Sequence, residues 1–117
     1  MHRPRPSSRK LGADAERRVR RHFRLRGYRI LAANAWRGGY ELDLVVRRGR
    51  RLLFCEVKAK TGTAYGEPWE MVGPEKARRV RRAAEAWLAA RPELAGLDVS
   101  LEAVSVRGGR VARTPLG

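Results

Sequence analysis

The sequence predicts an α/β or α+β domain in which a mixed β-sheet is flanked by helices. Two segments repeat apolar residues at helical spacing, four shorter segments are β-prone, and glycine or proline separates them. Their order is helix, strand, a hairpin of two strands, helix and strand, which fits a mixed sheet. With 117 residues, of which 43% are hydrophobic, the chain has the size of one folded domain.

The first helix is expected over residues 12–26 and ends at Gly27. Its apolar residues recur at helical spacing, namely Leu11, Ala15, Val19 and Phe23. Residues 28–32 are β-prone, and the asparagine and two glycines within 34–39 predict a turn after this strand.

A β-hairpin follows, with strands over 40–46 and 52–58 and a type II′ turn at Gly49 and Arg50. Regular alternation gives the first strand two faces, one with Tyr40, Leu42, Leu44 and Val46 and the other with Glu41, Asp43 and Val45.

The hairpin register brings two carboxylates together. With Gly49 and Arg50 in the turn, Arg48 faces Arg51, and paired residue numbers sum to 99. Asp43 then stands opposite Glu56, with Cβ atoms roughly 4.5–5.5 Å apart.

The C-terminal half supplies a second helix and a last strand. Residues 59–73 are irregular, and Trp69 among them either packs over the core or stacks on a base. Pro74 suits the first turn of the second helix, which ends before Pro92. The last strand is expected over 99–106.

These elements define a domain over residues 11–107. A basic, disordered tail is expected over 1–10 and a C-terminal tail over 108–117.

The chain is strongly basic, with 27 Lys and Arg against 12 Asp and Glu and a net charge of +15. The net charge is +8 over residues 1–27, +5 over 28–65 and +2 over 66–117. Such a field attracts polyanions, chiefly nucleic acid or an anionic membrane. Arginine supplies 23 of the basic residues and lysine 4, which a nucleotide-composition bias of the source genome would also produce.

The cysteine content and the hydropathy exclude several classes of protein. Cys55 is the single cysteine, which excludes a disulfide within the monomer and a cysteine zinc site. No apolar run reaches the length of a membrane span, and no secretory signal follows the basic start. We therefore expect a cytoplasmic protein without a membrane partner.

The paired carboxylates predict a metal site. Two ionised carboxylates at this spacing repel each other, and a divalent cation reverses that interaction. Mg²⁺ commonly takes one or two carboxylates together with waters and substrate phosphates. Asp43 and Glu56 are therefore candidate ligands of Mg²⁺ or Mn²⁺, with Glu41 as an alternative. Lys58 shares a face with Glu56 and suits contact with an attacking water, because the pKa of a lysine can fall.

These residues also fit a purely structural role. Asp43 and Glu56 can equally be solvent-facing residues of a half-exposed hairpin, neutralised by nearby arginines. Lys58 can equally be a charge on an edge strand that discourages aggregation. Glu16 lies near the apolar side of the first helix, where it either supports the metal or pairs with Arg20.

The motif of Asp43, twelve further residues and Glu56-Val57-Lys58 resembles the signature of the PD-(D/E)xK nuclease superfamily. More closely, the chain resembles the YraN-like family of uncharacterised bacterial proteins, which is similar in fold to Holliday junction resolvases and type II restriction endonucleases. The matching stretches are Gly12 through Glu16, Gly27 through Leu31 with Asn34, Glu41 through Val45, and Leu53 through Lys58, extended by Gly66, Val72, Lys76 and the helix from Ala83 to Leu88.

This resemblance covers roughly residues 11–106 and implies an α/β fold with a restriction endonuclease-like core. It also implies metal ligation by Asp43, Glu56 and the Val57 carbonyl, a catalytic Lys58 and a supporting Glu16.

The leading hypothesis is a metal-dependent endonuclease, with branched DNA as the implied substrate and a homodimer as the implied assembly. The alternatives are a non-catalytic DNA- or RNA-binding module on the same fold and a protein of anionic membrane surfaces. The expected contacts to backbone phosphates are Arg17, Arg20, Arg21, Arg24, Arg48, Arg50, Lys60 and Lys76.

Overall fold

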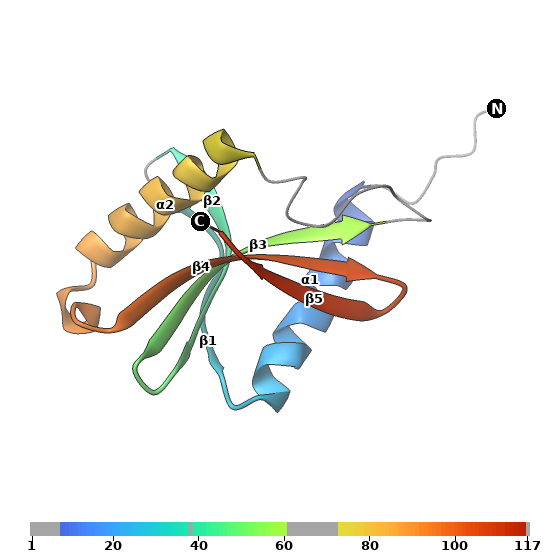
Figure 1. Ribbon diagram of the computed structural model, residues 1–117, viewed down its shortest axis with the longest axis horizontal. Coiled ribbons are helices and arrows are strands. Elements are labelled where there is room, and N and C mark those ends of the chain that lie inside the picture. Colours follow the sequence, from blue (N-terminus) through green and yellow to red (C-terminus); the bar gives the residue numbers. More distant parts are fainter. Residues whose placement is uncertain (1–7, 38, 61–72, 117) are drawn as a thin grey trace.

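The computed structural model describes residues 8–37, 39–60 and 73–116, which form one five-stranded sheet with two α-helices (Figure 1). The helices are α1 (Ser8–Leu25), α2 (Pro74–Ala89) and the short 3-10 helix η2 (Pro92–Leu94). The strands are β1 (Arg29–Arg37), β2 (Tyr40–Arg48), β3 (Arg51–Lys60), β4 (Asp98–Arg107) and β5 (Arg110–Pro115).

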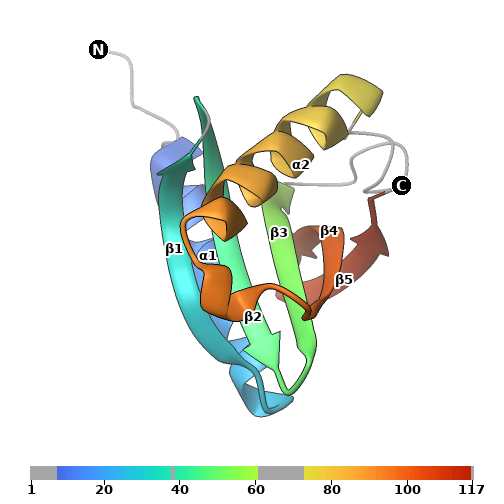
Figure 2. The same ribbon diagram turned by 90° about the vertical axis from the view of Figure 1, so that its left-hand side faces the viewer.

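The sheet is mixed, which confirms the predicted α/β fold class. Its strand order is β1-β2-β3-β4-β5; β3 and β4 are parallel, and the other neighbours are antiparallel. The two helices cover opposite faces of the sheet, as Figure 2 shows from the side. The architecture is consistent with a restriction endonuclease-like core.

The core beneath α1 forms because an apolar stripe of this helix meets one face of the sheet. Ala15, Val19 and Phe23 are buried, as their spacing predicts. The helix begins at Ser8, four residues before its predicted start. Gly27 follows it with φ +85°, a conformation that glycine adopts without steric cost.

The core beneath α2 centres on Trp87, whose ring meets that of Phe54 edge-on at 5.5 Å between centroids. The helix begins at Pro74, as predicted. Arg91 stacks over the indole at 3.9 Å and donates a hydrogen bond to the Trp87 carbonyl at 3.1 Å. Arg91, which follows the end of α2, therefore packs on Trp87, the largest of the fully buried side chains.

The turn predicted over 34–39 is too long, because β1 continues to Arg37 and, among the described residues of this range, only Gly39 lies in a turn. Ala33 pairs with Leu44, and Ala35 with Leu42, so pairing with β2 outweighs the local preference of asparagine for a turn. Asn34 keeps a trace of that preference in its φ of +52°, which asparagine tolerates better than most residues.

The predicted hairpin register is confirmed from Arg48↔Arg51 to Leu44↔Cys55. Gly49 has φ +59°, as the first central residue of a type II′ turn requires.

The predicted C-terminal tail over 108–117 is also wrong, because β5 pairs with β4 from Arg107↔Arg110 to Glu102↔Pro115. The strand satisfies the backbone groups of an otherwise open edge of β4. Arg113 adds a two-pronged ion pair to Glu102, with N–O distances of 2.7 and 2.9 Å. In the predicted N-terminal tail, residues 8–10 belong to α1, and residues 1–7 lie outside the described part.

Within the described residues, neither α-helix is long and apolar enough to cross a membrane.

Candidate active site

Asp43 of β2 and Glu56 of β3 line one hollow of about 290 Å³ on the α2 side of the sheet. Glu56 is 8% exposed, although it is a carboxylate, and Asp43 is half-buried. Tyr40 and Glu41 of β2 complete one wall, and the first half of α2 forms the other. Buried carboxylates are rare without a charged partner or a metal, which marks this hollow as a candidate site.

The two carboxylates meet in a different way from the predicted cross-strand pair. Pairing between β2 and β3 ends at Leu44↔Cys55, one residue short of Asp43 and Glu56. Instead, the backbone N–H of Val57 donates a hydrogen bond of 2.8 Å to Asp43 Oδ2. The Asp43 side chain thus reaches across to β3 and satisfies a backbone donor at the point where the ladder stops.

The alternation predicted for β2 fails at this same point. Leu44 and Val46 pack beneath α1, as one face should, whereas Tyr40 and Leu42 pack on the α2 side. The change of face coincides with the end of the β2–β3 ladder at Leu44, beyond which β2 stays paired with β1 alone. Glu41 and Asp43 both line the hollow, as their predicted common face requires.

Two ammonium groups contact the same oxygen of Glu56. Lys76 Nζ lies 2.8 Å from Glu56 Oε1, and Lys58 Nζ lies 3.3 Å from it. Lys58 comes from the same face of β3, as its spacing predicts, whereas Lys76 comes from the first turn of α2. Glu56 is therefore paired from both its own strand and the covering helix.

Burial and charge shift the pKa values of these groups. Burial, followed by the charge of Glu56, raises the pKa of Asp43 to about 7, although the Val57 N–H opposes this rise. Burial and the neighbouring Lys76 lower the pKa of Lys58, against the attraction of Glu56. Burial is the largest single effect on the pKa of Lys76 and acts to lower it, but the hydrogen bonds with Glu56 and Lys58 and the negative charges of Glu56 and Asp43 together raise the pKa.

The donor set suits a hard cation that needs few protein ligands. Within residues 8–37, 39–60 and 73–116, no group of three or more His, Cys, Asp or Glu side chains is arranged to hold a metal. Mg²⁺ requires only one or two carboxylates, since waters and substrate phosphates complete its octahedron. Burial is the larger cause of the raised pKa of Asp43, and the charge of Glu56 adds a repulsion that such a cation would relieve.

Glu16 lies elsewhere. Its Oε2 accepts a hydrogen bond of 3.2 Å from Asn34 Nδ2, and Glu16 is absent from the lining of the hollow that holds Asp43. The alternative pair with Arg20 is not among the ion pairs of the described residues. The structure thus links α1 to β1 through Glu16 and does not bring it to the carboxylate pair.

The residues predicted to contact phosphates occupy several surfaces. Arg17 and Arg21 line a hollow beside α1, where Arg17 pairs with Asp14. Arg20 and Arg24 also belong to α1, and Arg48 and Arg50 lie at the β2–β3 turn. Lys60 ends β3, and its side chain lies outside the described part. Lys76 belongs to the hollow itself.

Sequence reasoning missed three members of the hollow, Tyr40, Arg79 and Val80. The guanidinium of Arg79 lies 5.8 Å from the centre of the Tyr40 ring and 3.6 Å from Glu75. Arg79 follows Lys76 by three residues and thus shares its helix face, which is the signal that could have found it. Trp69, a candidate for base stacking, lies outside the described residues.

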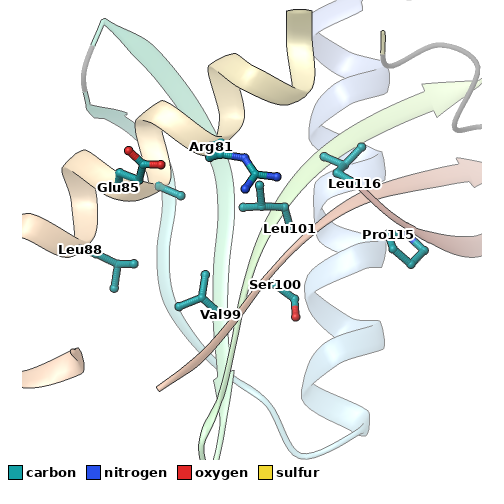
Figure 3. Close-up of a pocket in the computed structure, with 9 residues that line it drawn as sticks. Arg81, Glu85, Leu88, Val99, Ser100, Leu101, Pro115 and Leu116 are labelled. Atoms are coloured by element: carbon teal, nitrogen blue, oxygen red, sulfur yellow. The ribbon is translucent and has the colours of Figure 1, made fainter. Parts of the chain in front are cut away.

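A second hollow, of about 480 Å³, lies between α2 and the first half of β4 (Figure 3). Leu88, Val99, Leu101 and Leu116 make it largely apolar, with Arg81 and Glu85 on its α2 side. It contains no pair of carboxylates and thus no arrangement for acid–base or metal chemistry.

Comparison with known proteins identifies related sequences. The sequence model of the uncharacterised protein family UPF0102 matches residues 15–106. A UPF0102 protein of Frankia alni is 43% identical over 108 residues, which cover 92% of this chain and 84% of that relative. One of Frankia casuarinae is 47% identical over 88 residues, or 74% of each chain.

A third relative, from Acidothermus cellulolyticus, is 47% identical over 79 residues, or 67% of this chain. The match spans only 59% of that relative's own length. The range matched by the family, 15–106, contains Asp43, Glu56, Lys58 and Lys76.

Proposed function

The chain belongs to the uncharacterised protein family UPF0102, and we propose that it is a nucleic-acid-binding protein that hydrolyses phosphodiester bonds as a metal-dependent endonuclease. Its membership agrees with the resemblance to the YraN-like family. The observation that carries the proposal is the buried pair of Asp43 and Glu56 in one hollow, with Lys58 against Glu56, on a chain of net charge +15. Paired acids with a lysine suit hydrolysis of a phosphodiester more than simple binding of one.

Asp43 and Glu56 would hold Mg²⁺ or Mn²⁺, with the Val57 carbonyl as a further proposed ligand. The bound cation would supply a nucleophilic water at neutral pH and neutralise charge on the phosphate. Burial of Glu56 keeps bulk water from competing for these charges.

We propose that Lys58 acts on the attacking water, which is the nucleophile. Its side-chain nitrogen lies beside Glu56, and its lowered pKa suits a group that, as the neutral amine, accepts a proton from the attacking water. Lys76 and Arg79 enter the same hollow from α2, where their positive charges suit the phosphate of the substrate.

The basic surfaces of α1 and of the β2–β3 turn suit the backbone of a nucleic acid, without reading its sequence. We propose DNA, and branched DNA in particular, as the substrate, since the resemblance to resolvases favours it. A homodimer would bring two such sites to one branched substrate. The buried thiol of Cys55 fits a reducing compartment, and we propose the cytoplasm.

One observation favours a second candidate, a binding module without catalysis. Lys76 at 2.8 Å and Lys58 at 3.3 Å already neutralise Glu56 without a metal. If the carboxylates serve only as partners in ion pairs within the protein, the protein would bind nucleic acid without hydrolysing it.

The proposal is tested by incubating labelled duplex, single strand, flap, four-way junction and RNA with Mg²⁺, Mn²⁺ or EDTA. We expect cleavage of at least one DNA substrate with either metal, none in EDTA, and loss of cleavage in Lys58→Ala. Binding that persists in EDTA with no cleavage of any substrate would instead support the binding module.

Lys76→Met is expected to bind Mn²⁺ about tenfold more tightly than the wild-type protein in the absence of nucleic acid. The variant removes an ammonium 2.8 Å from Glu56 Oε1, where it competes with the cation, and keeps the length of the side chain. Titration with Mn²⁺, followed by electron paramagnetic resonance, measures this affinity. Lys76→Arg keeps the charge and should resemble wild type, and an unchanged affinity in Lys76→Met would rule out the competition.

A further inference from the structure

A hollow of about 330 Å³ lies at the opposite end of β2 from the carboxylate pair. Its lining residues come from two places, the segment that connects α1 to β1 and the turn between β2 and β3. They are Gly27, Arg29, Arg47, Arg48 and Gly49. Segments about twenty residues apart in the sequence thus contribute three arginines to the lining of one space, because β1 pairs with β2 at Arg29↔Arg47.

The charge of this hollow is uncompensated within the described residues. None of its five lining residues is acidic. No ion pair among residues 8–37, 39–60 and 73–116 involves Arg29, Arg47 or Arg48. The carboxylate of Asp98 is nearby in the fold but lies 3.9 Å from Arg50 and pairs with that residue. Three adjacent cations without a counter-ion favour an anionic ligand.

Contacts with the backbone hold two of these arginines in place. Arg48 Nη1 donates a hydrogen bond of 2.9 Å to the Arg26 carbonyl, and its guanidinium lies 4.7 Å from the centre of the Tyr28 ring. Arg47 Nε donates one of 2.8 Å to the Gly49 carbonyl. A guanidinium has five N–H donors, so each arginine keeps donors for a ligand while its position is fixed.

Two glycines line the hollow, and each has a positive φ. A Cβ atom at Gly27 would lie 3.5 Å from Arg48 Cδ, and at φ +85° any side chain would also be strained. Gly49 has φ +59° and nothing within 4 Å of its Cβ position, so the wall at the turn is bare backbone.

We propose that this arginine hollow binds a phosphate group of the nucleic-acid backbone, as an anchor separate from the carboxylate site. Guanidinium forks match the paired oxygens of a phosphodiester, and such contacts fix the position of a nucleic acid without reading its bases. The identity of the polymer rests on the proposed function, whereas the anion site rests on the arginines themselves.

The position of the anchor sets a minimum length for the substrate. Arg48 lies five residues beyond Asp43 along β2, roughly 17 Å at the rise of an extended strand. A duplex advances about 3.4 Å per base pair along each strand, so a substrate shorter than about five steps cannot reach both sites.

The test measures binding in EDTA, so that it is independent of cleavage. Fluorescence anisotropy follows a labelled duplex of about 20 base pairs over a series of salt concentrations, with Arg29→Gln/Arg47→Gln beside wild type. Each lost phosphate contact removes about 0.9 from the salt slope of log K. We therefore expect the slope to fall by about 2 and the affinity by about fiftyfold at ~0.1 M salt.

A charge-matched control, Arg107→Gln/Arg110→Gln, removes two exposed cations at the β4–β5 turn. Equal losses in both double variants would overturn the anchor in favour of a diffuse field. Arg29→Gln alone repeats the test if the double variant unfolds, because Arg29 has no side-chain hydrogen bond or ion pair within the described residues.

Competition by inorganic phosphate distinguishes a polymer from a small ligand. We expect displacement of the duplex only at about millimolar phosphate, because one phosphate contributes a single contact. Displacement at micromolar phosphate would overturn the assignment to a polymer. Normal anchoring together with no cleavage would refute the nuclease and leave the anchor standing.

Discussion

Glu56→Gln is expected to lower the rate of metal-dependent phosphodiester hydrolysis by on the order of 10³-fold or more. Glutamine keeps the volume of a side chain that is only 8% exposed, and its carbonyl still accepts hydrogen bonds from Lys58 and Lys76. It lacks the negative charge that a divalent cation requires, so the proposed metal and the water that it would activate should be lost together. Single-turnover cleavage of the best substrate measures the effect.

The matched control for this prediction is Glu85→Gln, which makes the same change at an exposed position on α2. It should cleave at the wild-type rate. Nucleic-acid affinity in EDTA should be unchanged or slightly higher in Glu56→Gln, since the hollow becomes more positive. Cleavage by Glu56→Gln at the wild-type rate would exclude the carboxylate pair as the catalytic centre.

Asp43→Asn is expected to stabilise the metal-free protein at pH 8 and to change its stability little at pH 4. Burial and Glu56 raise the pKa of Asp43 to about 7 in the folded protein, compared with about 3.9 in an unfolded chain. Between these values the folded state holds a proton that the unfolded chain has released. The free energy of unfolding of the wild-type protein therefore falls as pH rises from about 4 to about 7, and it levels off above that.

The size of this effect has an upper bound of about 4 kcal/mol, from about 1.4 kcal/mol for each of roughly three pKa units. Asparagine removes the charge, and its carbonyl oxygen can still accept the 2.8 Å hydrogen bond from Val57. Urea denaturation in EDTA at pH 4 and pH 8 measures the difference. Asp98→Asn, at an exposed carboxylate, should show no such pH dependence, and an equal gain for Asp43→Asn at both pH values would contradict the prediction.

Addition of Mg²⁺ to the same samples separates stability from metal binding. At pH 8 the cation should stabilise the wild-type protein, because it binds the folded state alone, and it should not stabilise Asp43→Asn. If neither Mg²⁺ nor Mn²⁺ changes the free energy of unfolding of the wild-type protein, the metal site is refuted, whereas the predicted pH dependence of stability is unaffected.

The two helices and the β2–β3 hairpin were predictable because their signals are local. Ala15, Val19 and Phe23 repeat at helical spacing, and all three are buried. The turn at Gly49 sets the register of the hairpin by its own geometry, and the ladder follows it to Leu44↔Cys55. Glu56 and Lys58 share a face because they are two residues apart on one strand. Their side chains form an ion pair with an N–O distance of 3.3 Å.

The errors arose where partners distant in the sequence decide the conformation. Asn34 lies within β1 and not in a turn, because β2 offers a ladder to pair with. Residues 110–115 form β5 because they pair with the edge of β4, and the Glu102–Arg113 ion pair stabilises this pairing. Local propensity is worth a few tenths of a kcal/mol per residue, about the same as or less than one backbone pairing contributes.

Asp43, Glu56 and Lys58 and their places on two paired strands are readable from the amino-acid sequence, because strand periodicity and turn geometry act over a few residues. The packing of distant elements is what brings Lys76 and Arg79 into the hollow with Asp43 and Glu56, pairs Glu16 with Asn34, and joins Arg29 to Arg47 and Arg48. Those neighbours depend on how α2 packs across the sheet and how β1 pairs with β2. Such contacts are selected by burial over the whole core, and no short stretch of sequence specifies them.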